Sequence, residues 1–140
     1  MNLALKDKQG KSRFGFSHAL NGLKSVITTE LNFRIHLIAS LCVIAAGIVF
    51  RLEVMQWAVV VLVIGFVLVT EVINTSIEKM MDYLKPDIHP RAKAIKDMAA
   101  GAVLISAVIA VVVGLLIFIP EILSYIQTVF VNFAAIYPRS

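Results

Sequence analysis

Charged residues are scarce in this chain of 140 residues: Asp, Glu, Lys and Arg make up 16% of it, and 59% of the residues are hydrophobic. Soluble domains usually contain about a quarter charged and about half apolar residues. This shortage of charge excludes a soluble domain of ordinary composition and predicts an integral membrane protein. The length predicts one compact unit, so we interpret residues 1–140 as a single domain.

Cysteine occurs once, as Cys42 within an apolar stretch. A single cysteine excludes a disulfide framework, and we expect this thiol to have a packing role. Residues 1–14 contain charges but no apolar core followed by a cleavage site. We therefore expect no signal peptide and a chain that keeps its first residues.

The nucleotide-binding signatures of soluble enzymes are absent. The nearest match to a phosphate-binding loop, Gly22-Leu-Lys24-Ser25, lacks the earlier glycine that this motif requires. The His-Arg-Asp and Asp-Phe-Gly signatures of protein kinases do not occur. His18, His36 and His89 do not have the spacing of a zinc site, although His89 is a minor candidate for ligand contact. Any nucleotide chemistry must therefore use another architecture.

Three long apolar runs are present, at residues 37–50, 54–69 and 98–119. Phe33 and Ile35 extend the first run, and the third run contains no charged residue. A membrane-spanning helix needs about 20 predominantly apolar residues. We therefore predict an all-α membrane protein with three transmembrane helices.

Residues 16–27 form an amphipathic pattern ahead of the first apolar run. Phe16, Leu20, Leu23 and Ile27 recur at helical spacing, with polar residues on the opposite side. This pattern predicts an N-terminal helix that lies along the cytoplasmic membrane surface.

The tail after Pro120, residues 121–140, also contains one apolar face, formed by Ile122, Tyr125, Ile126, Val129 and Phe133. Two interpretations are open, a fourth span or a helix that lies in the membrane interface. We favour the interfacial helix.

Basic residues are concentrated before the first span and after the second. The two clusters are Lys6, Lys8, Lys11, Arg13, Lys24 and Arg34, and then Lys79, Lys85, Arg91, Lys93 and Lys96. The positive-inside rule places the N-terminus and the 79–97 loop in the cytoplasm. The formal net charge of +4 requires no nucleic acid partner, because anionic lipid headgroups or phosphates account for it.

A polar stripe follows the second apolar run. At about 100° per residue, Glu71, Asn74, Glu78 and Asp82 fall on one side of a continuous helix. Ionisable groups at membrane depth usually face the interior of a helix bundle and mark function. Their mutual repulsion would be relieved by a divalent cation, and carboxylates without thiolates favour a hard ion such as Mg²⁺.

Glu30 is another carboxylate at a position where an apolar residue is expected. On an uninterrupted helix from Phe16 it would lie on the apolar face, turned inward. Two interpretations are open at this point: Glu30 and Glu78 hold one cation together, or Glu30 forms a salt bridge with Arg34 four residues later.

Lys96 and Asp97 lie at the cytoplasmic entrance to the third span. The lysine is suited to neutralising phosphate, although positive charge at this position also anchors a span. Farther along, Ala102, Ser106, Ala110 and Gly114 recur every four residues, which predicts a ridge for close helix packing.

These segments together resemble the prokaryotic diacylglycerol kinase family. The segments that carry the resemblance are Glu71-Val-Ile-Asn74-Thr-Ser-Ile-Glu78 with Asp82, Lys96-Asp97-Met-Ala-Ala-Gly-Ala-Val-Leu, and Glu30-Leu-Asn-Phe33-Arg34, within a core at about residues 14–120. The segments Asn32-Phe-Arg-Ile-His36 and His89-Pro-Arg-Ala-Lys-Ala-Ile-Lys-Asp97 look more like the undecaprenol kinase branch.

The resemblance implies a homotrimer that transfers the γ-phosphoryl group of MgATP to the hydroxyl of a membrane lipid, undecaprenol or diacylglycerol, at the bacterial inner membrane. It implies that Glu30 and Glu78 bind the metal and nucleotide, that Glu71 is the general base on the lipid hydroxyl, and that Asn74 supports the carboxylates. Lys96 would contact phosphates and Asp97 the nucleoside. The tail, residues 121–140, exceeds the usual family length.

The competing interpretation is a non-enzymatic transporter or assembly subunit with an acidic relay, which leaves Glu30 and the Lys96-Asp97 pair unexplained.

Overall fold

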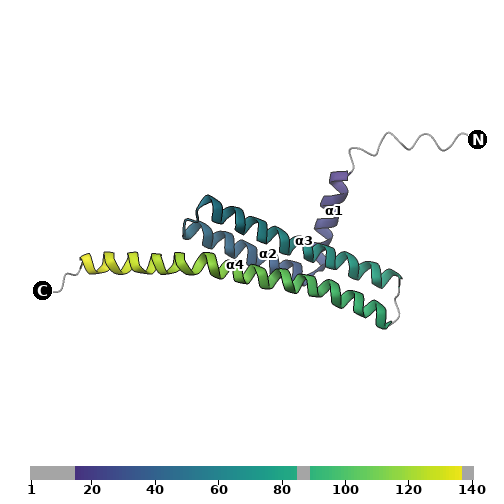
Figure 1. Cartoon of the computed structure of the whole chain (residues 1–140). Helices are drawn as coiled ribbons and strands as arrows, with labels where there is room; N and C mark the ends of the chain where they lie inside the picture. Colours follow the sequence, from purple (N-terminus) through teal and green to yellow (C-terminus); the bar gives the residue numbers. More distant parts are fainter. Residues whose placement is uncertain (1–14, 85–88, 137–140) are drawn as a thin grey trace, which may run out of the picture.

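The computed structural model describes residues 15–84 and 89–136, and the side chains up to residue 132. Within these ranges the chain is all helical, with α1 at Gly15–Thr29, α2 at Leu31–Val49, α3 at Val54–Leu84 and α4 at Pro90–Ile136 (Figure 1). This confirms the predicted N-terminal helix followed by three long apolar helices. Each of α2, α3 and α4 is long and apolar enough to cross a membrane.

The chain turns sharply between α1 and α2. Glu30 is the single residue that separates them, and its backbone is extended, with φ −101° and ψ 117°. Figure 1 shows α1 turned away from the common direction of the other three helices. The apolar side chains of Phe16, Leu20, Leu23 and Ile27 are exposed, as expected for a helix whose apolar face meets lipid.

The turn between α2 and α3 is tight. Arg51 adopts the left-handed conformation with φ 56°, and the Leu52 backbone N–H donates to the Gly47 carbonyl at 3.0 Å. A Cβ atom on Gly47 would lie 2.8 and 2.9 Å from ring carbons of Trp57 and 3.1 Å from Cδ1 of Leu52. A side chain at position 47 would therefore force the indole ring of Trp57 to shift, because this ring lies directly against the backbone.

Gly47→Ala should destabilise the folded protein by about 1–3 kcal/mol, the usual cost of overpacking a close contact. Thermal unfolding followed by circular dichroism in detergent measures the effect. Gly65→Ala is the matched control, since a Cβ atom there meets nothing within 4 Å. Equal unfolding temperatures for the two variants would contradict the close approach of Trp57.

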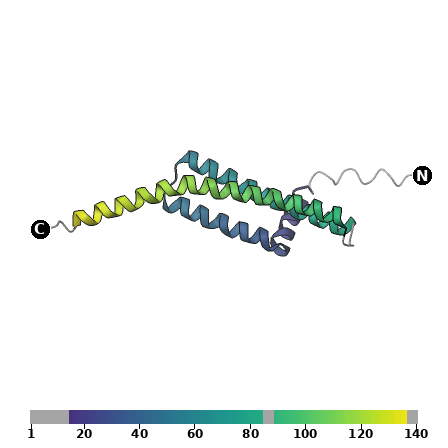
Figure 2. The same cartoon turned by 60° about the horizontal axis from the view of Figure 1, so that its bottom comes forward.

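Helices α3 and α4 pack against each other along much of their length (Figure 2). At the centre of this contact the hydroxyls of Thr70 and Ser106 lie 2.9 Å apart, and Ser106 is completely buried. The predicted small-residue ridge is partly wrong, because Ala102 is exposed while Ala99 and Val103 are buried. A period of 3.6 residues moves a strict four-residue repeat gradually off the contact face.

The prediction of a separate interfacial helix after Pro120 is wrong. Helix α4 continues through Pro120 to Ile136, and Figures 1 and 2 both show it running on past the α2–α3 turn. Side chains that precede and follow Pro120 contact residues at the α2–α3 turn. Gln56 Nε2 donates to Glu121 Oε1 at 2.9 Å, and the Phe50 ring lies 6.2 Å from that of Phe118 and 5.9 Å from that of Tyr125.

Cys42 also differs from expectation, since its side chain is exposed and has no packing role within the single chain.

Helix α3 has 31 residues, about 46 Å at 1.5 Å per residue, whereas the hydrocarbon core of a bilayer is about 30 Å thick. The final turns of α3, which carry the polar stripe, therefore extend to the membrane surface and beyond it.

Candidate functional site

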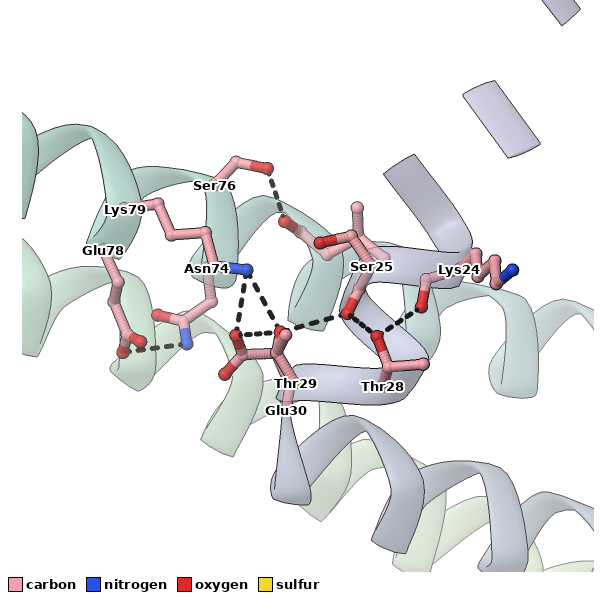
Figure 3. A network of polar contacts seen from close by, with 10 residues as sticks. Lys24, Ser25, Thr28, Thr29, Glu30, Asn74, Ser76, Glu78 and Lys79 are labelled. Atoms are coloured by element: carbon pink, nitrogen blue, oxygen red, sulfur yellow. Dashed lines mark hydrogen bonds and ion pairs between the residues drawn. The ribbon is translucent and has the colours of Figure 1, made fainter. Parts of the chain in front are cut away.

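Polar side chains of α1, of Glu30 and of α3 meet where the α1–α2 junction lies against α3 (Figure 3). Glu30 is the N-cap residue of α2, but its side chain makes no capping hydrogen bond. Its Oε1 instead accepts a hydrogen bond from the Thr29 hydroxyl at 2.8 Å and pairs with Lys79 Nζ at 3.1 Å. The carboxylate is thus directed away from its own helix and towards α3.

Glu30 pairs with Lys79, so the interpretation as an i,i+4 salt bridge with Arg34 is wrong. The Arg34 backbone N–H does contact the Glu30 carbonyl oxygen, at 3.4 Å. The hydrogen bond from Thr29, followed by that from Lys79, lowers the pKa of the Glu30 carboxyl. Glu30 is therefore a carboxylate at neutral pH, and its ion pair is lost only as the pH falls through this lowered value.

The first half of the predicted stripe on α3 faces inward, whereas Glu78 is half-buried and Asp82 is exposed. Glu71 is 2% exposed and Asn74 is 5% exposed. Asn74 Nδ2 donates to Glu78 Oε1 at 3.2 Å, which joins two members of the stripe. The Glu71 carboxyl interacts electrostatically with Glu78 and Glu30, so the three acidic groups share one region of the chain.

Two buried oxygen atoms at this place have no hydrogen-bond partner among the described residues: Asn74 Oδ1 and Thr75 Oγ1. Buried polar atoms are nearly always paired, so an unpaired one requires an explanation. An amide oxygen beside the Glu78 carboxylate is a hard donor of the kind that Mg²⁺ prefers. The donors present therefore fit a magnesium ion.

No group of three His, Cys, Asp or Glu side chains that could hold a metal ion occurs within residues 15–84 and 89–136. A cage made from protein ligands alone is therefore absent from the described chain. Magnesium commonly uses one or two carboxylates and completes its shell with water and phosphate oxygens. The site is thus suited to a metal that arrives with a phosphate ligand.

The second predicted cluster joins α3 to the first turns of α4. Lys96 Nζ contacts Asp82 Oδ1 at 2.9 Å, and both side chains are solvent-accessible. Asp97 is exposed. Asp82 is the ion-pair partner of Lys96 within the described residues, and Glu78 acts on this lysine only electrostatically. A single chain therefore does not bring Lys96 into contact with the carboxylates of Glu30 and Glu78.

His89 has a structural contact. Its Nδ1 accepts a hydrogen bond from the Arg91 backbone N–H at 3.2 Å, at the first turn of α4. It thereby satisfies one of the backbone donors that a helix N-terminus leaves free.

An apolar groove of about 520 Å³ lies between α2 and α4, with α3 as its floor. His36 and Ser40 line one end, and Phe118 and Ile122 line the other. His36 also interacts electrostatically with Glu71. The groove therefore ends close to the buried carboxylate, a connection that the sequence alone did not reveal.

Comparison with known proteins agrees with these features. The sequence pattern of a family described as prokaryotic diacylglycerol kinase matches residues 17–118. The chain is 41% identical to an undecaprenol kinase of Bacillus subtilis over 107 residues, which cover 76% of this chain and 87% of the relative. It is 38% identical to a diacylglycerol kinase of Synechocystis over 110 residues, 78% of this chain and 63% of the relative. It is 24% identical to a diacylglycerol kinase of Escherichia coli over 95 residues, 68% of this chain and 78% of the relative.

Proposed function

Because the chain belongs to the prokaryotic diacylglycerol kinase family and is a multi-pass membrane lipid kinase, we propose that it transfers the γ-phosphoryl group of MgATP to the hydroxyl of undecaprenol. The observation that carries this proposal is the buried carboxylate of Glu71, which lies between an apolar groove and a charged, solvent-accessible pair. A lipid alcohol and a water-soluble nucleotide need such a boundary in order to meet.

Glu71 is the general base in this proposal. A carboxylate positioned at the lipid hydroxyl accepts its proton as the hydroxyl oxygen attacks the γ-phosphorus and the bond from that phosphorus to the bridging oxygen breaks, so that ADP leaves. Asn74 orients the adjoining carboxylate of Glu78 through its amide N–H. Bulk water is excluded from Glu71, whose side chain is buried. The proton therefore passes to the Glu71 carboxylate and not directly to bulk water.

Glu30 and Glu78 hold the nucleotide-bound magnesium in this proposal, with Asn74 Oδ1 as a further oxygen donor. Magnesium, when bound, neutralises charge on the phosphate oxygens, which is the main requirement of phosphoryl transfer. Lys96 contacts the phosphates and Asp97 the nucleoside. Both are exposed or half-exposed on α4, where a ligand from the cytoplasm can reach them.

The groove supports a lipid acceptor with a long apolar chain. It runs from His36 to Ile122 and is lined almost entirely by apolar side chains. A chain lying in this groove would place its terminal hydroxyl at the His36 end, near Glu71. Similarity to the Bacillus subtilis relative favours undecaprenol over diacylglycerol.

Several further features belong to the same proposal. We infer a homotrimer in the bacterial inner membrane, with the N-terminus and residues 79–97, the end of α3 and the start of α4, in the cytoplasm, where the basic residues are concentrated. In a trimer, a neighbouring subunit would supply the Lys96 and Asp97 that one chain leaves apart from Glu30. We also infer that residues 14–120 form the kinase core, since the family match covers residues 17–118.

Purified full-length protein in detergent, mixed with labelled ATP and Mg²⁺, tests the proposal directly. Undecaprenol and diacylglycerol are assayed side by side at equal surface concentration. Labelled undecaprenyl phosphate formed faster than labelled phosphatidic acid supports it. The reverse preference would overturn the choice of acceptor, and no labelling of either lipid would overturn the transfer itself.

A further inference from the structure

A lysine already lies on one of the two carboxylates that the proposed function assigns to magnesium. Lys79 Nζ is 3.1 Å from Glu30 Oε1 and donates to the Thr29 hydroxyl at 3.2 Å (Figure 3). Thr29 in turn donates to the same Glu30 oxygen at 2.8 Å. Two hydrogen-bond donors therefore already contact Oε1 of this carboxylate.

The Glu30–Lys79 ion pair can readily give way to other ionic contacts. The Lys79 side chain is 51% exposed and that of Glu30 is 25% exposed. Ion pairs with this exposure are weak, because water and salt compete with them. The lysine also has a flexible stem of four carbons, so its ammonium group can change partner without movement of the helix.

Lys79 is the residue directly after Glu78, so its ammonium belongs to the same turn of α3 as the second candidate metal ligand. Lys96, the lysine that the sequence singled out, is engaged with Asp82 at 2.9 Å. Among the ion pairs of the described residues, Lys79 is thus the cation that contacts Glu30. A divalent ion at Glu30 would compete with this ammonium for the charge of the same carboxylate.

We propose that Lys79 is an exchangeable counter-ion of the nucleotide site. Without nucleotide, it neutralises Glu30. When MgATP binds, magnesium takes its place on the Glu30 carboxylate, and the released ammonium pairs with phosphate oxygens of the same nucleotide. No covalent bond is formed or broken, and the positive charge of Lys79 stays within the site throughout. This inference rests on the proposed function, since it concerns how that site accepts its nucleotide.

Lys79→Met tests the exchange, because methionine keeps an unbranched stem without the charge. Mn²⁺ binding to the full-length protein in detergent, measured by electron paramagnetic resonance without nucleotide, should become about threefold tighter as the competitor is lost. MgATP binding, measured by calorimetry, should become about tenfold weaker as one charged contact is lost. Opposite changes in the two affinities distinguish exchange from general damage.

Two further variants complete the test. Lys93→Met removes an exposed positive charge from α4 and should leave both affinities within about twofold, because surface charges contribute little. Lys79→Arg keeps the charge and should retain wild-type MgATP affinity. Weaker Mn²⁺ binding in Lys79→Met, or behaviour identical to Lys93→Met, would overturn the inference. Lipid labelling by the unchanged protein, measured in parallel, shows separately whether the proposed function holds.

Discussion

Glu71→Gln should retain MgATP binding but transfer phosphate to lipid about a hundred- to ten-thousand-fold more slowly, the range expected when a general base is removed. Glutamine has nearly the same shape as glutamate, so the buried position next to Asn74 stays filled. It cannot accept a proton at neutral pH. The loss should therefore appear in kcat, with little change in nucleotide affinity.

Initial rates of lipid labelling at saturating MgATP measure kcat, and calorimetry with MgATP measures the nucleotide affinity. Glu121→Gln is the matched control, because this carboxylate contacts Gln56 at the α2–α3 turn, at the other end of the helices. We expect the control to keep wild-type turnover. Full turnover in Glu71→Gln would remove Glu71 from its role as base.

The helices α1, α2 and α3 could be predicted from the sequence because local physics determines them. Apolar side chains at helical spacing define α1, and long apolar runs define most of α2 and the first part of α3. The continuation of α3 beyond Val69 followed from the way the polar residues fall on one side of a helix. Burial of Glu71 and Asn74 within a single chain confirms that this side faces inward.

The end of α4 could not be predicted in this way. A proline inside a helix removes one backbone hydrogen bond and usually bends or ends the helix. Here the outcome depends on contacts with residues far away in the sequence, through Gln56 and Phe50. Such contacts are set by how α4 lies against the α2–α3 turn, which no local pattern records.

The same limit applies to the charged side chains. The sequence pointed to Glu30 as an inward-facing carboxylate, and the structure directs it towards α3 as expected. The sequence identifies its partner Lys79 only as one of the basic residues that set the orientation, because the pairing depends on how the α1–α2 junction crosses α3. The pairing of Lys96 with Asp82 was missed for the same reason. The roles given to Glu30, Glu71, Asn74, Glu78, Lys96 and Asp97 remain predictions.

Replacing Glu78 with glutamine should weaken MgATP binding by about a hundredfold and abolish the stimulation of activity by added Mg²⁺. Even residues that only support a metal ligand change metal affinity by about ten- to a hundredfold, so a direct ligand should reach at least the upper value. The carbonyl of the introduced amide can still accept the hydrogen bond that Asn74 Nδ2 donates. The helix and its packing are thereby preserved, and the lost quantity is one negative charge.

Calorimetry with MgATP, repeated with ATP in the presence of a chelator, separates the metal contribution from direct nucleotide contacts. The two affinities should converge in Glu78→Gln, since the metal no longer links the nucleotide to α3. Glu53→Gln removes an equal charge at the α2–α3 turn, where the Glu53 backbone N–H donates to Gln56 Oε1, and should preserve the difference between them. If Glu78→Gln retains that difference, magnesium is held elsewhere. The acidic groups of α3 would then act only on the lipid hydroxyl.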